Sequence, residues 1–318
     1  MRWAAKAPVP SPCWIALREG RARLIMSEPK ISVSVVVPVY NRRDLLVDAI
    51  ESALKQSFPP EEIIVVDDGS EDGVETIDFP AIDPRIRLIR HERNLGGSAA
   101  RNTGIDAAIG DWVALLDCDD QWLPGKLERQ IAEIQGSNSS DRFFVCSNTF
   151  VAHGDGAVLS HNKRPPERDE NIAEYLMVEN AALQTSTLLI PTSIAREVRF
   201  RDGLRRHQDW DFVLRLIATG VDWRYIDEPL SVYYLGPDQR RVSLREGAVS
   251  DTLAWFKQAK DLLTPRAMQT YFVHSALGRR SLETPLRTAG ALLWVAGASW
   301  DGAIRVPALM IAKLLRRS

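Results

Sequence analysis

The hydrophobic positions in the first half of the chain form short unbroken runs, separated by segments with helical spacing. The runs are rich in β-branched residues and lie at 31–40 (ISVSVVVPVY), 63–66 (IIVV) and 112–116 (WVALL). A shorter strand is expected at 86–89. Unbroken runs of this kind are typical of strands buried on both faces of a parallel sheet.

Helical spacing occupies the segments between these runs. Asn41 is placed to cap a helix that follows the first run, residues 98–109 form a second helix behind Gly96-Gly97, and Pro124 opens a third. The alternation of strands and helices predicts an α/β fold with an open, mostly parallel sheet, flanked by helices and joined by right-handed crossovers.

Beyond residue 140 the pattern is less regular. Residues 152–170 are polar and rich in Pro and Gly, which predicts a mobile loop. Strands are expected at 143–146, 185–190, 221–226 and 230–234. Helices are expected at 209–219, 246–263, 265–280 and 285–316, the first ending at Gly220.

The chain therefore divides into a leader at 1–30, an α/β domain at 31–240 and a helical C-terminal region at 241–318. Pro8, Pro10 and Pro12 interrupt the apolar part of the leader, which excludes a signal peptide and predicts disorder. Whether the chain begins at Met1 or Met26 is left open.

The composition of the chain argues against several classes of function. The formal net charge of −2 gives no global electrostatic reason to expect a nucleic-acid partner. The three cysteines form no C-x-x-C pair, which favours a reducing, cytoplasmic setting, and the five histidines form no H-x-x-x-H pair, which argues against zinc. The sequence contains no run of about 18 or more apolar residues, so no transmembrane helix is predicted.

Polar groups follow three of the predicted strands directly, at Pro38–Asn41, Asp67–Ser70 and Asp117–Asp120. In an open α/β sheet the ligand binds at the carboxyl ends of the strands, so these groups are expected to converge on one site. Asp67-Asp68-Gly69 taken alone is also an ordinary turn sequence.

The D-x-D sequence is the sharpest chemical signal. Asp117 and Asp119 are expected to share Mn²⁺ or Mg²⁺ with a diphosphate, because these ions accept one or two carboxylates together with phosphate oxygens and water. Cys118, between them, is expected to point into the core as a small hydrophobe.

Two further segments carry candidate site residues. The segment 94–102 (NLGGSAARN) lacks G-x-G-x-x-G, and is expected to bring backbone near Gly97 and the Arg101 side chain to the diphosphate. A surface ion pair is the alternative for Arg101. Asp209, at the start of a helix, is either a plain cap or a general base.

Taken in order, the segments VSVVVPVYNR, IIVVDDGSEDG, RNLGGSAARNTG, DWVALLDCDDQW and HQDWDFVLRL resemble the motifs of family-2 glycosyltransferases of GT-A fold, over residues 31–235. The resemblance implies an inverting, metal-dependent transfer from a nucleotide-diphospho-sugar to an acceptor hydroxyl by single displacement, in glycan or glycolipid biosynthesis. A UDP-sugar is the preferred donor.

The resemblance also assigns roles to residues. Asp209 falls on the catalytic base, and Asp117 and Asp119 on the metal motif. The predicted donor-binding residues are Pro38, Tyr40, Asn41, Asp68, Gly97, Arg101 and Asp117, with Pro38, Tyr40 and Asp68 lining the nucleoside. The chain departs from the family's usual Glu at Arg42, Ala at Cys118 and Glu at Gln208.

The acceptor is expected to be a saccharide or a lipid-linked sugar. No Q-x-x-R-W motif occurs, so transfer is expected to be non-processive. A sugar nucleotidyltransferase and a catalytically silent sugar-nucleotide-binding module remain as alternatives. Residues 285–318 are apolar with an excess of positive charge, which fits either peripheral contact with an anionic membrane or burial of the apolar face against the α/β domain or in a dimer contact.

Overall fold

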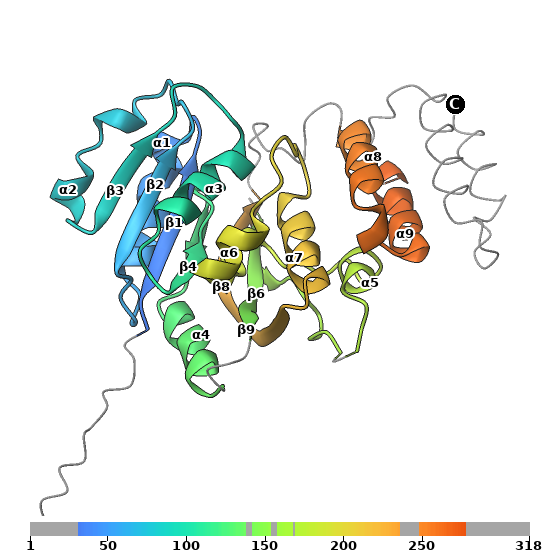
Figure 1. Ribbon diagram of the computed structural model, residues 1–318. Coiled ribbons are helices and arrows are strands. Elements are labelled where there is room, and N and C mark those ends of the chain that lie inside the picture. Colours follow the sequence, from blue (N-terminus) through green and yellow to red (C-terminus); the bar gives the residue numbers. More distant parts are fainter. Residues whose placement is uncertain (1–30, 138–141, 154–157, 168, 236–247, 278–318) are drawn as a thin grey trace, which may run out of the picture. The chain divides into compact units, whose positions relative to one another are not determined.

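The computed structural model describes residues 31–137, 142–153, 158–167, 169–235 and 248–277 (Figure 1). From Ser32 onward these residues belong to one compact unit. The predictions for the leader at 1–30 and for the tail at 285–316 fall outside the described residues.

Nine strands of the described chain form a single sheet in the order β3-β2-β1-β4-β8-β6-β9-β5, with β7 paired to β6. The strands are β1 (Val33–Val39), β2 (Glu62–Asp67), β3 (Ile86–Arg90), β4 (Trp112–Leu115), β5 (Asp120–Trp122), β6 (Phe143–His153), β7 (Val158–Ser160), β8 (Leu189–Pro191) and β9 (Asp222–Leu235). The block β3-β2-β1-β4 is entirely parallel, as the unbroken hydrophobic runs predict. Beyond β4 the sheet is mixed, because β8 runs antiparallel to both β4 and β6.

The parallel block places its carboxyl ends at one edge. Val39 of β1 pairs in register with Asp67 of β2, and Val36 pairs with Leu115 of β4. Every residue of β1 and β2 is buried, so both strands are covered on both faces. The segments that follow β1, β2 and β4 therefore emerge side by side.

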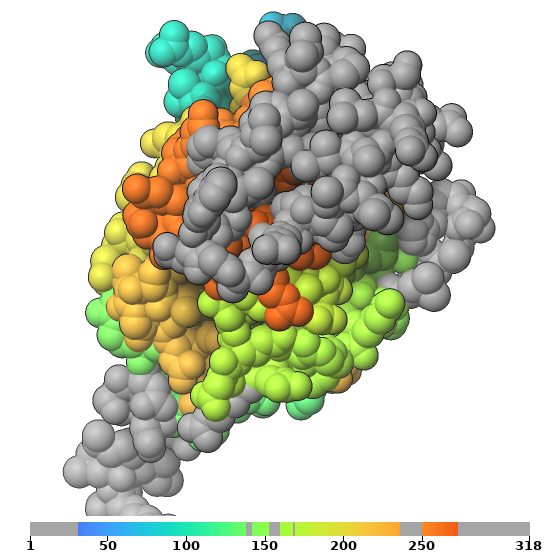
Figure 2. Space-filling model, turned by 90° about the vertical axis from the view of Figure 1, so that its right-hand side faces the viewer, coloured from blue at the N-terminus to red at the C-terminus, as the bar shows by residue number. Residues whose placement is uncertain are grey.

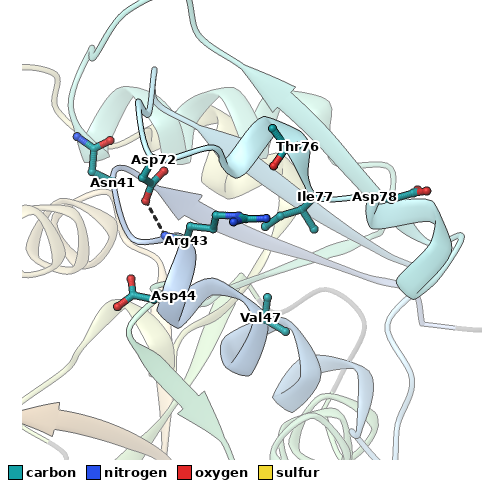
Figure 3. A pocket seen from close by; sticks show the side chains of 8 residues that line it. All are labelled: Asn41, Arg43, Asp44, Val47, Asp72, Thr76, Ile77 and Asp78. Atoms are coloured by element: carbon teal, nitrogen blue, oxygen red, sulfur yellow. Dashed lines mark hydrogen bonds between the residues drawn. The ribbon is translucent and has the colours of Figure 1, made fainter.

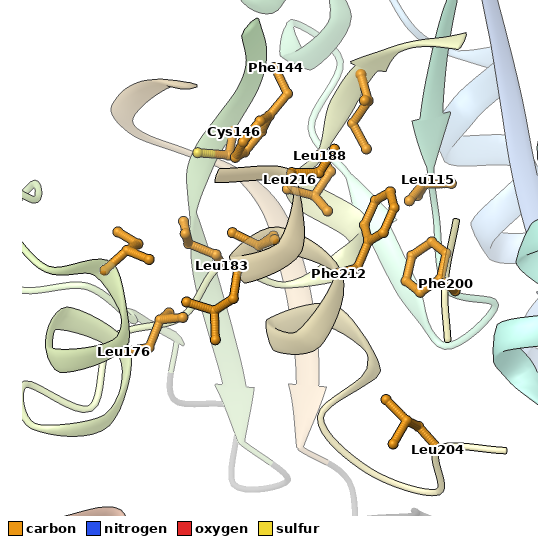
Figure 4. Close-up of a cluster of buried hydrophobic side chains, with 14 of the residues drawn as sticks. Leu115, Phe144, Cys146, Leu176, Leu183, Leu188, Phe200, Leu204, Phe212 and Leu216 are labelled. Atoms are coloured by element: carbon orange, nitrogen blue, oxygen red, sulfur yellow. The ribbon is translucent and has the colours of Figure 1, made fainter. Parts of the chain in front are cut away.

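The helices cover both faces of this sheet. They are α1 (Arg43–Leu54), α2 (Phe79–Ile82), α3 (Gly97–Ala107), α4 (Lys126–Gln135), α5 (Ile172–Met177), α6 (Thr192–Val198), α7 (Gln208–Ala218), α8 (Ala248–Gln258) and α9 (Pro265–Leu277), with 3-10 turns at Val74–Thr76, Thr185–Thr187 and Lys260–Leu262. One large core cluster joins the sheet to α3 and to α5 through α9. Figure 4 shows Phe212 and Leu216 of α7 within it.

The C-terminal helices pack against the middle of the chain. Trp255 and Phe256 of α8 and Phe272 of α9 are buried in the same core cluster as the sheet. Thr264 Oγ1 donates to Glu174 Oε1 of α5 over 2.8 Å. Figure 2 shows α8 and α9 on the face where residues of α5 and α7 also lie. In the described part of the chain, no helix is both long enough and apolar enough to cross a membrane.

Several local predictions were wrong. Residues 185–187 form a 3-10 turn, and only the end of the predicted strand at 185–190 belongs to β8. The two strands expected at 221–226 and 230–234 are one continuous strand, β9, since Pro229 lies at an irregularity in its pairing with β6 and does not end it. The loop expected at 152–170 contains β7, and β5, α2, α5 and α6 were missed because each is short.

Candidate active site

The turns after β1 and β2 are tied together by Asn41. Its backbone N–H donates to Ser70 Oγ over 2.9 Å, and its Oδ1 accepts from Glu71 N over 2.7 Å. The predicted helix cap was therefore wrong: Arg42 is the residue before α1, without a side-chain cap bond, while Asn41 has a φ of 51°. Asn41 tolerates this left-handed conformation better than most residues, and its side chain holds the edge of the site together.

Pro38 and Tyr40 occupy this edge in different ways. Pro38 is buried inside β1, opposite Val66 of β2. Tyr40, directly after β1, leaves 41% of its surface exposed. Tyr40 is therefore accessible to a ligand at the strand ends, whereas Pro38 is covered.

Asp68 is buried and anchors the loop before α3. Its Oδ1 accepts from Leu95 N over 2.9 Å and its Oδ2 from Gly96 N over 2.7 Å. His91 Nδ1 lies 2.7 Å from the same Oδ1, and His91 Nε2 lies 2.9 Å from Thr103 Oγ1. The carboxylate that the resemblance places near the base thus also fixes the loop that carries Gly97.

Sequence reasoning missed His91, although a signal was present. His91 directly follows β3 (Ile86–Arg90), which is parallel to β2, so it emerges at the same edge as Asp68. The loop after β3 also packs tightly on the turn at Gly69. A Cβ atom there would lie 2.7 Å from the carbonyl carbon of Arg93, and Gly69 has a φ of 76°, so only glycine is accommodated.

Arg101 connects two distant parts of the chain. Its Nη1 donates to Gln208 Oε1 over 2.7 Å and its Nη2 donates to Asp117 Oδ1. The guanidinium lies over the ring of Phe200, 5.3 Å from its centroid, and the residue is only 8% exposed. The alternative of a surface ion pair is therefore wrong. Gly97 leaves room for this arrangement, because a Cβ there would lie 3.1 Å from both Arg101 Nη1 and Gln208 Oε1.

The D-x-D turn is held from behind by Ser186. Asp117 N donates to Ser186 Oγ over 3.1 Å, and this hydroxyl donates to Asp120 Oδ2 over 2.6 Å. The side chains of Asp117 and Asp119 remain 29% and 22% exposed, while Cys118 is buried as predicted. Ser186 lies in the 3-10 turn at Thr185–Thr187, where the sequence predicts a strand, and nothing in its local sequence indicates this contact.

Asp209 lies in the first turn of α7, close enough to Asp117 and Arg101 to feel their charges. Its Oδ1 accepts from Trp210 N over 2.9 Å. Burial raises the pKa of Asp209 to about 6; the Trp210 amide lowers it, the negative charge of Asp117 raises it, and Arg101 lowers it. A carboxylate with this pKa is suited to accept a proton near neutral pH.

Asp211 is a different kind of residue. Its side chain is fully buried, and its Oδ2 accepts from Arg215 Nε over 2.8 Å. Its Oδ1 accepts from Trp255 Nε1 over 3.1 Å. Asp211 therefore holds helices together and has no access to an incoming hydroxyl.

A hollow of about 850 Å³ lies beside this site, between the start of α1 and the loop at 72–78 (Figure 3). Arg43 N donates to Asp72 Oδ2 over 2.8 Å at its wall. The hollow shares Asn41 with the site, but none of the acidic residues at 117, 119 and 209 lines it. We therefore assign the chemistry to the strand-end site and not to this hollow.

The carboxylates present are suited to a divalent cation shared with a ligand. Among the described residues, no group of three or more His, Cys, Asp or Glu side chains is arranged to hold a metal alone. Asp117 and Asp119 are partly exposed at the site, and a magnesium-type ion needs only one or two carboxylates when phosphate oxygens complete its shell.

Comparisons with known proteins agree with this geometry. The family model described as "Glycosyl transferase family 2" matches residues 34–183. The chain is 34% identical over 248 residues to the amylovoran biosynthesis glycosyltransferase AmsB of Erwinia amylovora, covering 76% of this chain and 82% of that protein. It is 48% identical over 231 residues to the succinoglycan biosynthesis protein ExoO of Rhizobium meliloti, covering 70% of this chain and 63% of that protein.

A solved structure shares the fold. S. aureus TarS 1-349 in complex with UDP-GlcNAc superposes with a TM-score of 0.65 at 20% identity, covering 84% of this chain and 80% of that chain. The predicted GT-A type fold is thereby confirmed.

Proposed function

Since this chain belongs to glycosyltransferase family 2, we propose that it moves a sugar from a nucleotide-diphospho-sugar, a UDP-sugar, to an acceptor hydroxyl with inversion, in polysaccharide biosynthesis. The bound UDP-GlcNAc of TarS and the polysaccharide pathways of AmsB and ExoO support the donor and the setting. Membership of the family sets aside the sugar nucleotidyltransferase alternative.

One observation carries the mechanism. Arg101 joins Asp117, after β4, to Gln208, the neighbour of Asp209 on α7. It thereby brings the end of the site that would hold the diphosphate next to the end that would hold the acceptor. Such positioning of reacting groups is a large part of the catalytic effect of an enzyme.

In the proposed step, Asp209 takes the proton of the acceptor hydroxyl while the hydroxyl oxygen attacks the anomeric carbon of the donor sugar. The new bond forms on the face opposite the diphosphate, and the bond to the diphosphate oxygen breaks with the electron pair leaving on the nucleotide. Asp117 and Asp119 would hold Mn²⁺ or Mg²⁺, which when bound neutralises charge on the leaving group. Arg101 adds a fixed positive charge at the same end.

The acceptor is proposed to be a saccharide or a lipid-linked sugar. Peripheral membrane contact through residues 285–318 stays a prediction, because these residues lie outside the described ones. The cytoplasmic setting also stays a prediction.

The experiment incubates the purified full-length protein with a panel of nucleotide-sugars and lipid-linked acceptors, with Mn²⁺ or with chelator. We expect free UDP and a product whose anomeric configuration, determined by NMR, is opposite to that of the donor. Retention of configuration would refute the single displacement, equal turnover with chelator would refute the metal, and binding without turnover on any acceptor or water would indicate a silent binding module.

A further inference from the structure

The helix that carries Asp209 begins from a residue in an uncommon backbone conformation. His207, the residue before α7, has a φ of 58° and a ψ of 28°, in the left-handed region. A residue other than glycine keeps such a conformation only where surrounding contacts impose it. Because Asp209 follows two residues later, the direction in which the helix starts also sets the position of its carboxylate.

The ring of His207 contacts Trp210 of α7 and Tyr271 of α9, and two further contacts come from the C-terminal helix α8. His207 Nε2 lies 3.0 Å from Thr252 Oγ1, and its ring stacks on Trp255 with the centroids 4.5 Å apart. Arg206 Nη1 also donates to Thr252 Oγ1, over 3.3 Å. Thr252 and Trp255 are both buried, so these contacts are shielded from water.

Helix α8 holds α7 at a second point, one turn further along. Trp255 Nε1 donates to the buried Asp211 carboxylate over 3.1 Å. His207 and Asp211 are four positions apart and share one side of the helix, whereas Asp209, between them, projects to another. On that other side Asp209 meets the charges of Asp117 and Arg101.

Helix α7 is therefore held from two sides. Gln208 binds Arg101 on the side of the site, and His207 and Asp211 bind α8 behind it. Each contact restrains the first turn of α7 from its own side, and the buried residues of α7 hold the rest of the helix in the core. Together they leave the first turn of α7 little freedom to move.

We propose that α8 positions the catalytic base of the active site. Thr252 and Trp255 of α8 are positioning residues that hold His207, and His207 in turn places Asp209 against the acceptor. This inference rests on the proposed role of Asp209 as the base. The match to the family model ends at residue 183, so α8 lies outside the matched segment.

The test compares Thr252→Val with Thr252→Ser in the full-length protein. Valine has the shape of threonine without the hydroxyl, and serine keeps the hydroxyl. We expect Thr252→Val to lower kcat by roughly 10- to 100-fold, since misplacement of a reacting group by about 1 Å has effects of this size. The KM for the nucleotide-sugar and the Kd for UDP should change less than about threefold, because the diphosphate end is untouched. Thr252→Ser should restore most of kcat.

Lys260→Ala is the matched control, because Lys260 is an exposed residue of the same C-terminal region and should leave kcat unchanged. A second variant, His207→Gly, guards against a misfolded valine variant. Glycine adopts a positive φ freely but loses the ring contacts, so it should also lower kcat with the Kd for UDP preserved.

A folded Thr252→Val protein with wild-type kcat would overturn the proposal, as would equal losses in the Val and Ser variants. If Thr252→Val does not fold, a wild-type kcat in His207→Gly would overturn it. Full turnover by Asp209→Asn would instead overturn the assigned base, which separates failure of the proposed function from failure of this inference.

Discussion

Arg42 Nη1 donates to Asp119 Oδ2 over 2.8 Å, which pairs the turn after β1 with a carboxylate 77 positions later. The two side chains are only 13% and 22% exposed. Arg42 is one of the positions at which the chain departs from the usual family pattern, and it faces a residue that we propose as a metal ligand. A guanidinium and a divalent cation on the same oxygen compete, so Arg42 bears directly on metal binding.

Arg42→Gln is expected to strengthen Mn²⁺ binding in the absence of nucleotide. The ion pair with Asp119 must be weakened or broken when the cation arrives, and a pair of this exposure contributes up to about 1 kcal/mol, or roughly a fivefold change in Kd. Calorimetric titration with Mn²⁺ measures the change. Arg43→Gln is the matched control, because it removes the same charge one residue later. Identical Mn²⁺ affinities in wild type and Arg42→Gln would show that the pair does not oppose the metal.

Asp209→Asn is expected to reduce turnover by about 10² to 10⁴ while the melting temperature and the UDP affinity stay near wild type. Asp211→Asn provides the contrast, because its buried carboxylate binds Arg215 and Trp255. Breaking a buried pair costs about 3–5 kcal/mol, so this variant should unfold at a clearly lower temperature. Kinetics and thermal unfolding on both variants check the assignment. A fully active Asp209→Asn enzyme would exclude Asp209 as the base.

The rate is expected to fall as the pH drops through about 6, because burial raises the pKa of Asp209 to about 6 and the base must be ionised to accept a proton. At pH 5 roughly one tenth of the enzyme would carry the ionised base. The measurement is kcat/KM between pH 5 and 8. Gln208→Glu should move this acid limb to higher pH, since it adds a negative charge beside Asp209. A rate that stays level down to pH 4.5 would contradict the assignment.

The parallel half of the fold and much of the site could be predicted from sequence for one physical reason. Buried parallel strands require unbroken apolar runs, and the residues that follow them emerge at one edge, which places Asp68 and Asp117 at the same edge of the sheet. The partners of these residues depend on tertiary placement and could not be predicted. Arg101 meets Gln208 across 107 positions of chain, and Ser186 reaches the D-x-D turn from an irregular segment.

Asn41 shows a second reason why local sequence alone cannot predict the structure. Asparagine is favoured both before a helix and in a left-handed turn, for the same reason: its short amide bonds nearby backbone groups. The local sequence cannot distinguish these uses, and the turn after β2 decided between them by supplying Ser70 and Glu71 as partners.

Lys126 provides a prediction about stability. It is fully buried at the start of α4, where its Nζ donates to Gln130 Oε1 over 2.7 Å and lies 4.2 Å from the ring centroid of Trp122. Burial lowers the pKa of Lys126 to about 7, below the value near 10.4 expected for an unfolded chain. Above pH 7 the unfolded state therefore binds more protons than the folded state, and the free energy of unfolding should rise with pH.

Between pH 7 and 8.5 this single group should add about 1.5 kcal/mol to the free energy of unfolding. Lys126→Met removes the titrating group while keeping an unbranched side chain, so the free energy of unfolding of wild type should rise by that amount relative to the variant across the same interval. Urea unfolding of both proteins at pH 7, 7.75 and 8.5 measures the difference, and subtracting the two curves cancels the other titrating groups. A difference that does not vary with pH would mean that Lys126 keeps its proton in the folded protein, with the Trp122 ring and Gln130 stabilising the charged form against burial.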